Sequence, residues 1–341
     1  MHREPSKRNI IIITTINLPN NLYDFKRLDR KGEWDYLVVG DLKTDHEAVR
    51  EICREIGGIY LSPEDQEKLG FTHSAALGWN CIERKNIGYL FALKENYELI
   101  GSLDDDNFPT EDWFERVKLG HSEEDVYESN TGWLNVADWA DVPYKLRGFP
   151  VHLFHQKPEI RVHESHVNIG IQSGLVLGDP DTDALTRIVN RPTVSRYSRS
   201  NFCLAEETMC PYNTQNTVLV RELVSANMMW AACGRYDDIF ASYVGQKIAW
   251  KHGYHVRYGD PLATQRRNDH NLVRDLKDEI LGMEIQETFL QAIADVKLKG
   301  HSPVEDLVDI VYFLLERIPL LPRSLKTLVD TWFYDVNKIL D

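Results

Sequence analysis

The first 110 residues alternate between apolar runs and amphipathic stretches, which is the pattern of a layered sheet built from β-α-β units. The apolar runs predict strands at residues 9–16, 34–40, 57–61 and 98–103. Between the second and third of these, Thr44-Asp45-His46-Glu47 has the form of a capping box, which predicts a helix running to about Ile56. In such a parallel sheet the loops after the first, second and fourth strands share one edge, where open α/β sheets bind ligands.

Helical periodicity dominates the last 70 residues, whereas the middle of the chain is irregular, with strand-like pieces at 167–178 and 214–220. Ser302 and Glu305 form a second capping box before an apolar run. We therefore predict an α/β domain over residues 1–271 and a C-terminal helical region over residues 272–341. The apolar faces of these helices suit packing on the sheet domain or on a second copy of the chain, as in a homo-oligomer.

Composition and charge limit the function classes. The chain is 43% hydrophobic and 27% charged, which is typical of a folded protein, and its formal net charge is −14. That charge disfavours a general nucleic-acid or anionic-membrane binder, because either needs a basic surface. The five cysteines are scattered and suggest a reducing compartment. The charged N-terminal segment "MHREPSKRN" and the short apolar run after it predict neither a signal peptide nor a membrane span, so we expect a cytoplasmic protein.

Three consecutive carboxylates, Asp104, Asp105 and Asp106, follow the fourth predicted strand. Like charges at about 4 Å repel by a few kcal/mol unless a cation lies among them. Side chains alternate along an extended segment, so Asp104 and Asp106 share one face and offer hard oxygen ligands to Mg²⁺ or Mn²⁺. The alternatives are a solvated turn, in which Asp106 or Asn107 caps the next segment, and, more weakly, a phosphatase of the haloacid-dehalogenase type. The spacing does not fit a calcium loop.

Polar groups at the same predicted edge are candidates for holding a nucleotide. Hydroxyl, amide and carboxylate groups at the tips of the first two strands could contact a base and ribose, although each tip is also an ordinary loop; these are Thr15, Asn17, Asp41 and Lys43. Residues 83–89 lie on a predicted helix just before the carboxylates, and Arg84 or Lys85 there could meet a diphosphate, with Asn86 beside them, unless the basic side chains only face solvent.

Two further segments carry candidate chemistry. Asp237 and Asp238 begin a predicted helix after a glycine and aromatic residues, where they could cap the helix or bind an acceptor hydroxyl and take its proton. Arg266, Arg267 and His270 lie in one loop and form the local basic patch that an anionic ligand would need in so acidic a chain.

These motifs resemble those of two families with the GT-A fold of glycosyltransferases. The N-terminal half, including "TTIN", "WDYLVVGDLKT" and "GSLDDDNFP", resembles the plant STELLO/DUF288 proteins. The middle resembles the reversibly glycosylated polypeptides, which include UDP-arabinopyranose mutases, in "RGFP", "GLVLGDPDTDA", "CPYNTQNTVLVRE" and "GRYDDIFASYV". Together these stretches cover roughly residues 9–285. The resemblance implies a GT-A (Rossmann-like) mixed sheet flanked by helices, with a C-terminal helical extension.

The resemblance also implies a nucleotide-sugar donor, with UDP favoured, and a glycan or other hydroxyl acceptor. Mn²⁺ or Mg²⁺ would bridge the carboxylates and the diphosphate, with Asp106 as metal ligand and Asp104 shared between metal and ribose. Asp105 would be a further donor contact, and Asp41 would contact the uridine. The remaining implied roles are the acceptor or sugar side for Asp237 and Asp238, and the phosphates for Arg266 and Arg267.

Two departures from the mutase pattern affect the expected activity. Gln265 replaces a histidine that could complete the metal shell, so His270 or a water becomes the candidate third ligand. Phe154 stands where the self-glycosylating proteins have an arginine, which favours transfer to a separate acceptor over mutase activity. We expect a metal-dependent glycosyltransferase, with a UDP-sugar mutase or a non-catalytic GT-A scaffold as alternatives.

Overall fold

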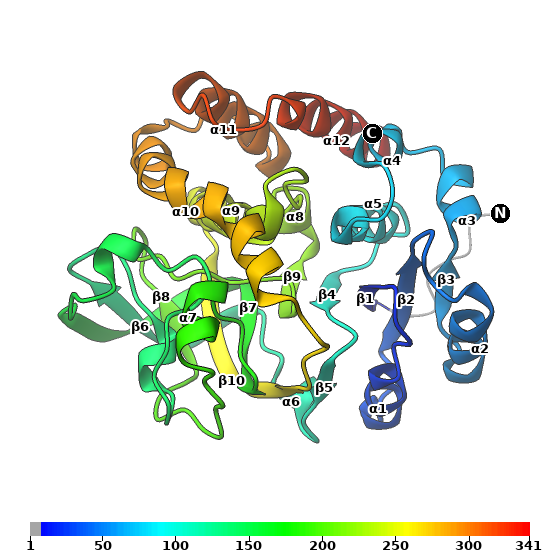
Figure 1. Cartoon of the computed structure of the whole chain (residues 1–341), viewed down its shortest axis with the longest axis horizontal. Helices are drawn as coiled ribbons and strands as arrows, with labels where there is room; N and C mark the ends of the chain where they lie inside the picture. Colours follow the sequence, from blue (N-terminus) through cyan, green and yellow to red (C-terminus); the bar gives the residue numbers. More distant parts are fainter. Residues whose placement is uncertain (1–7) are drawn as a thin grey trace.

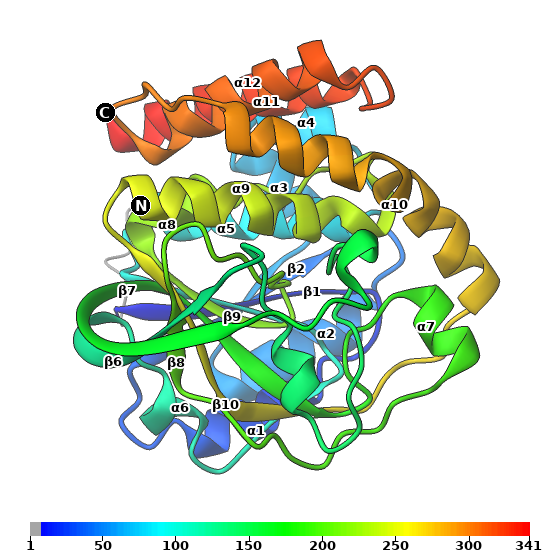
Figure 2. The same cartoon turned by 90° about the vertical axis from the view of Figure 1, so that its left-hand side faces the viewer.

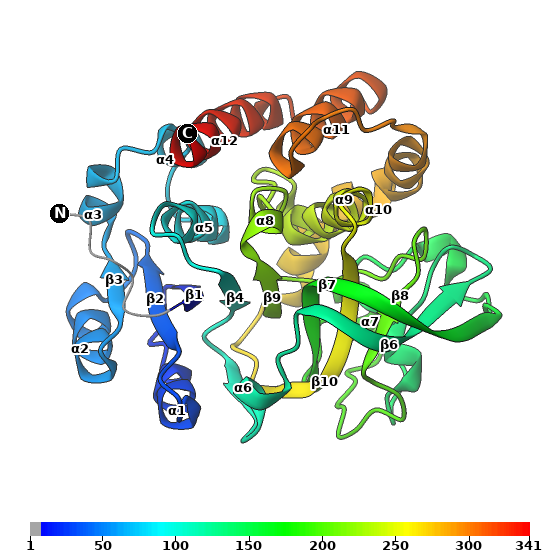
Figure 3. The same cartoon turned by 180° about the vertical axis from the view of Figure 1, so that it is seen from behind.

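The computed structural model describes residues 8–341, so most of the charged segment at the N-terminus lies outside it. Its centre is a ten-stranded mixed sheet in the order β3-β2-β1-β4-β9-β7-β6-β8-β10-β5 (Figure 1). The first four strands are parallel, and β9 runs antiparallel to β4 (Figure 3). Their bounds are β1 Asn9–Thr15, β2 Trp34–Gly40, β3 Ile59–Leu61, β4 Leu99–Leu103 and β9 Asn216–Val220. The parallel strands predicted from the apolar runs are therefore confirmed.

The first strand is apolar at consecutive positions because both of its faces are covered. Ile11 and Ile13 pack toward α1 (Asn21–Leu28) and α2 (His46–Ile56), whereas Ile10 and Ile12 pack toward α5 (Lys85–Lys94) on the opposite face. α5 approaches β1 so closely that a Cβ on Gly88 would lie 2.5 Å from Ile12 Cγ2. Only glycine permits this approach, which places the start of α5 beside the end of β4.

The second half of the sheet is built from longer and less regular strands. β7 (Ile160–Gly178) pairs with β6 (Gly120–Ser129) through its first half and with β9 and β10 (His255–Gln265) through its second half. The short strands are β5 Asn107–Pro109 and β8 Phe202–Leu204. The remaining helices before the C-terminal region are α3 Pro63–Lys68, α4 Thr72–Leu77, α6 Trp113–Arg116, α7 Ala184–Val189, α8 Arg221–Val224 and α9 Asp237–Lys251, with 3₁₀ turns at Ile82–Arg84, Val136–Trp139, Val151–Leu153 and Gly234–Tyr236.

The structure contains one of the two predicted capping boxes and lacks the other. The predicted capping box of Ser302 and Glu305 is confirmed at the start of α11 (Pro303–Arg317). The predicted box at Thr44 is wrong, because Asp45 caps α2 and the Thr44 hydroxyl instead donates to the Thr15 carbonyl, tying β1 to the loop after β2.

The C-terminal helices α10 (Leu272–Asp295), α11 and α12 (Ser324–Leu340) form a layer above α9, α8 and α5 (Figures 1 and 2). Their apolar side chains belong to the same buried cluster as β1 and β4. Trp332 is fully buried, and its indole nitrogen donates to the Ser225 carbonyl at 2.8 Å. The helical region therefore packs on the sheet domain, as one of the two predicted arrangements requires. No helix within residues 8–341 is long and apolar enough to cross a membrane.

The predicted α/β fold class is confirmed: a mixed sheet is flanked by helices and extended by C-terminal helices. The division at residue 271 remains a prediction, because the sheet and the last helices share one core.

Candidate functional site

A cavity of about 830 Å³ opens at the carboxyl ends of β1, β2 and β4 and extends to the start of α9. This is the edge predicted from the strand order. Among the described residues, ten carboxyl side chains line it, against five from lysine and arginine: Asp41, Glu83, Asp104, Asp105, Asp106, Asp181, Asp237, Asp238, Asp269 and Asp278, with Lys43, Arg84, Arg147, Arg235 and Arg267. Thr15, Asn17, Gln265 and His270 also line the cavity, whereas Asn86 and Arg266 do not.

Asp105 turns toward β1 and away from its two neighbours. One of its oxygens accepts hydrogen bonds from the Thr15 hydroxyl and from Asn17 Nδ2, the latter at 3.1 Å. The other oxygen accepts from Asn268 Nδ2 at 3.1 Å. Asp105 therefore joins the ends of β4 and β1 to the loop after β10, and its contacts with β1 distinguish it from Asp104 and Asp106.

Asp104 is held by a lysine that has no contact with solvent. Lys85 is 0% exposed, and its ammonium group donates to Asp104 Oδ1 at 2.9 Å and to the carbonyls of Leu103 and Thr214, each at 3.1 Å. All three of its protons are thus used. Lys85 acts here as a fixed counter-charge to Asp104, and its ammonium is not free to meet a diphosphate in this arrangement.

Asp106 is buried and only weakly compensated. Its oxygens accept from Asn107 Nδ2 at 3.1 Å, Gln265 Nε2 at 3.3 Å and the Asn268 amide at 3.4 Å. Burial, followed by the charge of Asp104, raises the pKa of Asp106 to about 6. Removing water and adding like charges both disfavour the ionised form, so a cation at this position would stabilise the carboxylate.

His270 does not join Asp104 and Asp106. Its Nδ1 lies 3.1 Å from Asp275 Oδ2, at the start of α10, whereas Gln265 occupies the position next to Asp106. In the part of the chain that the structure describes, no three His, Cys, Asp or Glu side chains are grouped so that they could hold a metal ion. The predicted set of three protein ligands is thus not assembled, because the loop carries His270 toward α10.

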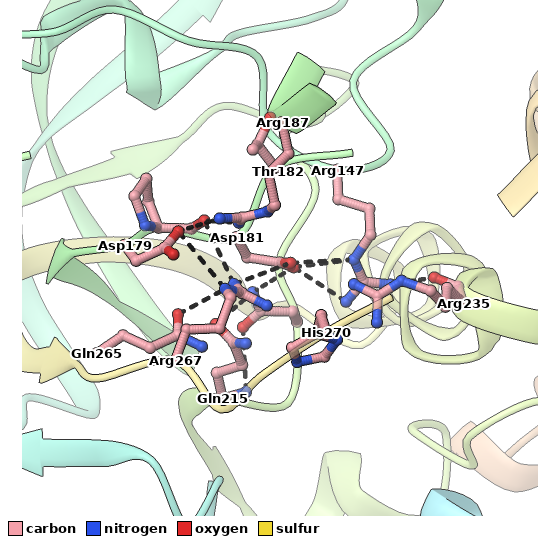
Figure 4. A network of polar contacts seen from close by, with 12 residues as sticks. Arg147, Asp179, Asp181, Thr182, Arg187, Gln215, Arg235, Gln265, Arg267 and His270 are labelled. Atoms are coloured by element: carbon pink, nitrogen blue, oxygen red, sulfur yellow. Dashed lines mark hydrogen bonds and ion pairs between the residues drawn. The ribbon is translucent and has the colours of Figure 1, made fainter. Parts of the chain in front are cut away.

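The two adjacent arginines of the basic loop have different environments. The Arg267 side chain is 9% exposed and lies near Asp179 and Asp181, with Nη2 donating to Gln265 Oε1 at 3.3 Å (Figure 4). Its buried Nε has no hydrogen-bond partner but lies 3.5 Å from Asp179 Oδ1 in an ion pair. Arg266 is exposed and stacks on the Phe108 ring at 4.3 Å, outside the cavity. Of these two arginines, Arg267 therefore lines the cavity and Arg266 does not.

A buried arginine that the sequence analysis left without a role organises the opposite wall. Arg147 donates through Nε to Asp181 at 3.0 Å and through Nη1 to Asp238 Oδ1 at 2.9 Å. Burial raises the pKa of Asp181, but the charges of Arg147 and Arg267 outweigh it and hold that pKa below the usual range. Asp238 also accepts from the Thr214 amide at 3.2 Å. In the sequence these residues lie in the motifs "RGFP", which contains Arg147, and "GDPDTDA", which contains Asp181. Neither motif predicts that the two side chains pair.

Asp237 and Glu83 are buried carboxyl groups of the cavity that lack a cation. They are 5% and 8% exposed, and neither forms an ion pair within residues 8–341. Burial raises the pKa of Asp237 well above its usual range, and the charges of Asp238 and Glu83 add to this. Burial likewise raises the pKa of Glu83. Neither Asp237 nor Asp238 is the N-cap of α9, as the capping alternative required, because that position is Tyr236. Glu83 was missed because a glutamate beside Arg84 reads as helix surface.

Three other predicted residues are engaged mainly with the protein. The Asp41 carboxylate accepts from the backbone amides of Asn80 at 2.8 Å and Cys81 at 3.0 Å, which orders that wall of the cavity. Arg84 is buried against Gln66, Ser74 and the Trp79 ring. Asn86 is fully buried and bonds to the backbone of Met229. Lys43 is exposed at the mouth.

Comparisons with known proteins agree with both resemblances. Residues 158–316 match the family model described as "Reversibly glycosylated polypeptide". Over 357 aligned positions the chain is 22% identical to "Probable glycosyltransferase STELLO1" of Arabidopsis thaliana, covering 96% of this chain and 44% of that protein. The chain thus spans less than half the length of this relative. A solved structure of Mycobacterium tuberculosis glucosyl-3-phosphoglycerate synthase, in complex with Mn²⁺, UDP and glucosyl-3-phosphoglycerate, aligns over 85% of this chain and 79% of that one, with 10% identity and a TM-score of 0.37.

Proposed function

We propose that this chain is a metal-dependent glycosyltransferase that moves a sugar from a nucleotide donor, UDP-linked, to an acceptor hydroxyl. The observation that carries the proposal is the cavity itself, which joins the carboxylates after β4 to Arg267 on one side and to Asp237 and Asp238 on the other. A donor phosphate group, a metal and an acceptor need these three kinds of groups within one site. Its volume lies within the range of about 300–1,000 Å³ that is typical of small-molecule sites.

The residues present fit a divalent cation. Asp104 and Asp106 offer hard oxygen ligands, and a divalent cation beside them would offset the burial and the charge of Asp104, which raise the pKa of Asp106. Because the protein does not supply three such side chains here, phosphate oxygens and water would complete the shell. When bound, Mn²⁺ or Mg²⁺ neutralises the charge that develops on the leaving diphosphate.

On the donor side, Arg267 is the residue placed to hold a phosphate. Its guanidinium is largely desolvated and lines the cavity, and a bound phosphate would accept charge-assisted hydrogen bonds from it beside its ion pair with Asp179. Asp41 and the Thr15–Asp105 contact shape the wall at the strand ends, where the base and ribose would lie. Arg266, stacked on Phe108, would contribute charge only at the rim.

On the acceptor side, Asp237 and Asp238 have separate tasks. Arg147 fixes the Asp238 carboxylate, so this residue orients substrate hydroxyls. Asp237 is not paired with a cation, and its raised pKa makes its ionised form the stronger base. In the proposed step the acceptor oxygen bonds to the anomeric carbon, the bond from that carbon to the diphosphate oxygen breaks, the nucleoside diphosphate leaves with the electron pair, and Asp237 takes the acceptor proton.

A thermal-shift screen of nucleotide sugars with and without Mn²⁺ tests the donor site, since a ligand that binds only the folded state raises its melting temperature. UDP-sugars with Mn²⁺ are expected to give the largest shift. Asp106→Asn should abolish the Mn²⁺-dependent part of the shift, whereas Asp112→Asn, outside the cavity, should leave it unchanged. Glycosyl transfer or donor hydrolysis that survives Asp106→Ala at the wild-type rate would show that the assigned metal role is wrong.

The mutase alternative has a specific structural expectation. Phe154, which stands in place of the arginine of the self-glycosylating proteins, packs on the Phe149 ring with centroids 6.3 Å apart. A side chain in that contact offers no nucleophile for self-glycosylation. Incubation with UDP-arabinopyranose should therefore yield no furanose product, and its appearance would favour the mutase.

A further inference from the structure

The side chains on the far wall of the cavity indicate which class of acceptor it binds. This wall begins at Glu83 and the start of α9 and includes Asp237, Asp238, Arg147 and Arg235. Its carboxyl groups outnumber its cations, and the placement of each cation determines whether any positive charge is left for a ligand.

Each arginine on this wall is neutralised by the protein. Arg147 is held between Asp181 and Asp238, with both carboxylates within 3.0 Å of its nitrogens. Arg235 Nε donates to Glu279, a fully buried carboxylate of α10, at 2.9 Å. An anionic acceptor would therefore meet no free cation here and would approach the charges of the carboxyl groups.

The two carboxyl groups of this wall that have no ion pair, Asp237 and Glu83, suit an uncharged ligand. Asp237 lines the cavity and is only 5% exposed. Among the described residues it forms neither an ion pair nor a hydrogen bond to another side chain. Glu83 reaches the same cavity from the turn before α5 and also has no ion pair there. A carboxylate without a cation accepts hydrogen bonds from the hydroxyl groups of a sugar, and these bonds compensate in part for the burial of its charge.

We propose that the acceptor is an uncharged polyhydroxy compound, such as a neutral glycan, and that Glu83 and Asp237 bind its hydroxyl groups. Glu83 then contacts the acceptor rather than the donor, and the wall rejects phosphorylated or carboxylated acceptors by charge. The inference rests on the proposed glycosyltransferase function and names the substrate class of the same site.

The test measures nucleotide release from the full chain with Mn²⁺ and a UDP-sugar that shifts its melting temperature. The acceptors are matched compounds: glucose and its neutral oligosaccharides, against glucuronate, glucose 6-phosphate, 3-phosphoglycerate and glucosamine. Neutral compounds are expected to accelerate release above donor hydrolysis, with kcat/KM at least about 10-fold above the anionic analogues, since one lost or opposed hydrogen bond accounts for such a factor.

Two variants separate acceptor binding from folding and from donor binding. Glu83→Ala should raise the acceptor KM about 10-fold, whereas Glu83→Gln, which can still donate and accept, should stay within about threefold of the wild type. In both variants the UDP and Mn²⁺ thermal shift should be unchanged. Glu47→Gln, on the exposed surface of α2, is the matched control.

The possible outcomes distinguish failure of the acceptor assignment from failure of the proposed function. Anionic or cationic acceptors used as well as neutral ones, or no acceleration by any neutral compound while the donor is bound and hydrolysed, would overturn the acceptor assignment and leave the donor site intact. If no nucleotide sugar binds at all, the proposed function itself fails.

Discussion

The ammonium group of Lys85 lies 2.9 Å from Asp104 Oδ1, and Lys85 is completely shielded from solvent. The same group donates to the Leu103 and Thr214 carbonyls, so one buried side chain joins α5, the end of β4 and the loop before β9. The Asp104 carboxylate, the first of the three, is therefore held in place by the buried Lys85 ammonium group. A ligand in the cavity does not need to supply this positive charge.

Lys85→Met is expected to destabilise the fold by about 3–5 kcal/mol, because it leaves a largely buried carboxylate without its partner. Guanidinium chloride unfolding measures this change. Lys94→Met, on the exposed surface of the same helix, should change stability by less than about 0.5 kcal/mol. A loss below about 1 kcal/mol for Lys85→Met would contradict the structural role assigned to this ion pair.

The adjacent arginines after β10 provide an internal comparison for phosphate binding. Arg267→Gln should weaken UDP binding by about 10- to 100-fold, since a charge-assisted hydrogen bond contributes about 1.5–3 kcal/mol. Arg266→Gln should change the affinity by less than about threefold, because its guanidinium stacks on Phe108 and is screened by solvent. Isothermal titration with UDP and Mn²⁺ distinguishes the two variants, and equal effects would show that both side chains reach the diphosphate.

His73 makes stability depend on pH through its buried ring. Nδ1 lies 3.1 Å from the Leu328 carbonyl and Nε2 lies 3.2 Å from Asn86 Nδ2, an arrangement that suits the neutral ring. Burial lowers its pKa to about 3. The unfolded chain, with a histidine pKa of about 6.5, therefore binds a proton that the folded chain does not, and stability falls as the pH drops from about 6.5 toward 3.

The expected slope from this one group is about 1.4 kcal/mol per pH unit. Urea unfolding of wild type and His73→Gln between pH 6.5 and 4.5 measures it as the difference between the two slopes. His301→Gln, at an exposed position, should retain the wild-type slope. Parallel curves for wild type and His73→Gln would mean that the buried ring accepts a proton without cost.

The last helix caps a short helix of the sheet domain. Asp335, which is 2% exposed, accepts from the Thr72 amide at 3.0 Å and the His73 amide at 2.8 Å, whereas Phe71, the N-cap of α4, provides no side-chain cap. Asp335→Ala should destabilise the protein by about 2–3 kcal/mol, because two amides lose their acceptor.

Thermal unfolding with Asp330→Ala as control tests this cap. Asp330 is on the same helix but forms a half-exposed pair with Lys326, which is expected to contribute less than about 0.5 kcal/mol. Equal stability of the two variants would contradict the idea that α12 holds α4 in place.

Local patterns were sufficient where the physics is local. The four parallel strands follow from consecutive apolar residues such as Ile10 to Ile13, and the α11 cap follows from Ser302 and Glu305 three residues apart. At Thr44 the local pattern failed, because a partner 29 positions away, the Thr15 carbonyl, competes for its hydroxyl. The prediction for the carboxylates after β4 assumed an extended segment, whereas the chain turns at Asp105 and Asp106. The Lys85 contact that holds Asp104 was not predictable from local pattern either.

The sequence by itself determined the sheet, the edge at which polar groups gather, and the chemical character of that edge, since strand alternation and the order of parallel strands depend on neighbouring residues. Only the tertiary structure decided which charged side chains are paired within the protein and which are left without a partner. It turned Arg267 inward and Arg266 outward, enclosed Arg147 between Asp181 and Asp238, and left Asp237 and Glu83 without cations. The reason is that the charge state of a buried group depends on its distance from groups far away in the chain and on the removal of water, and neither is encoded in the spacing of adjacent residues.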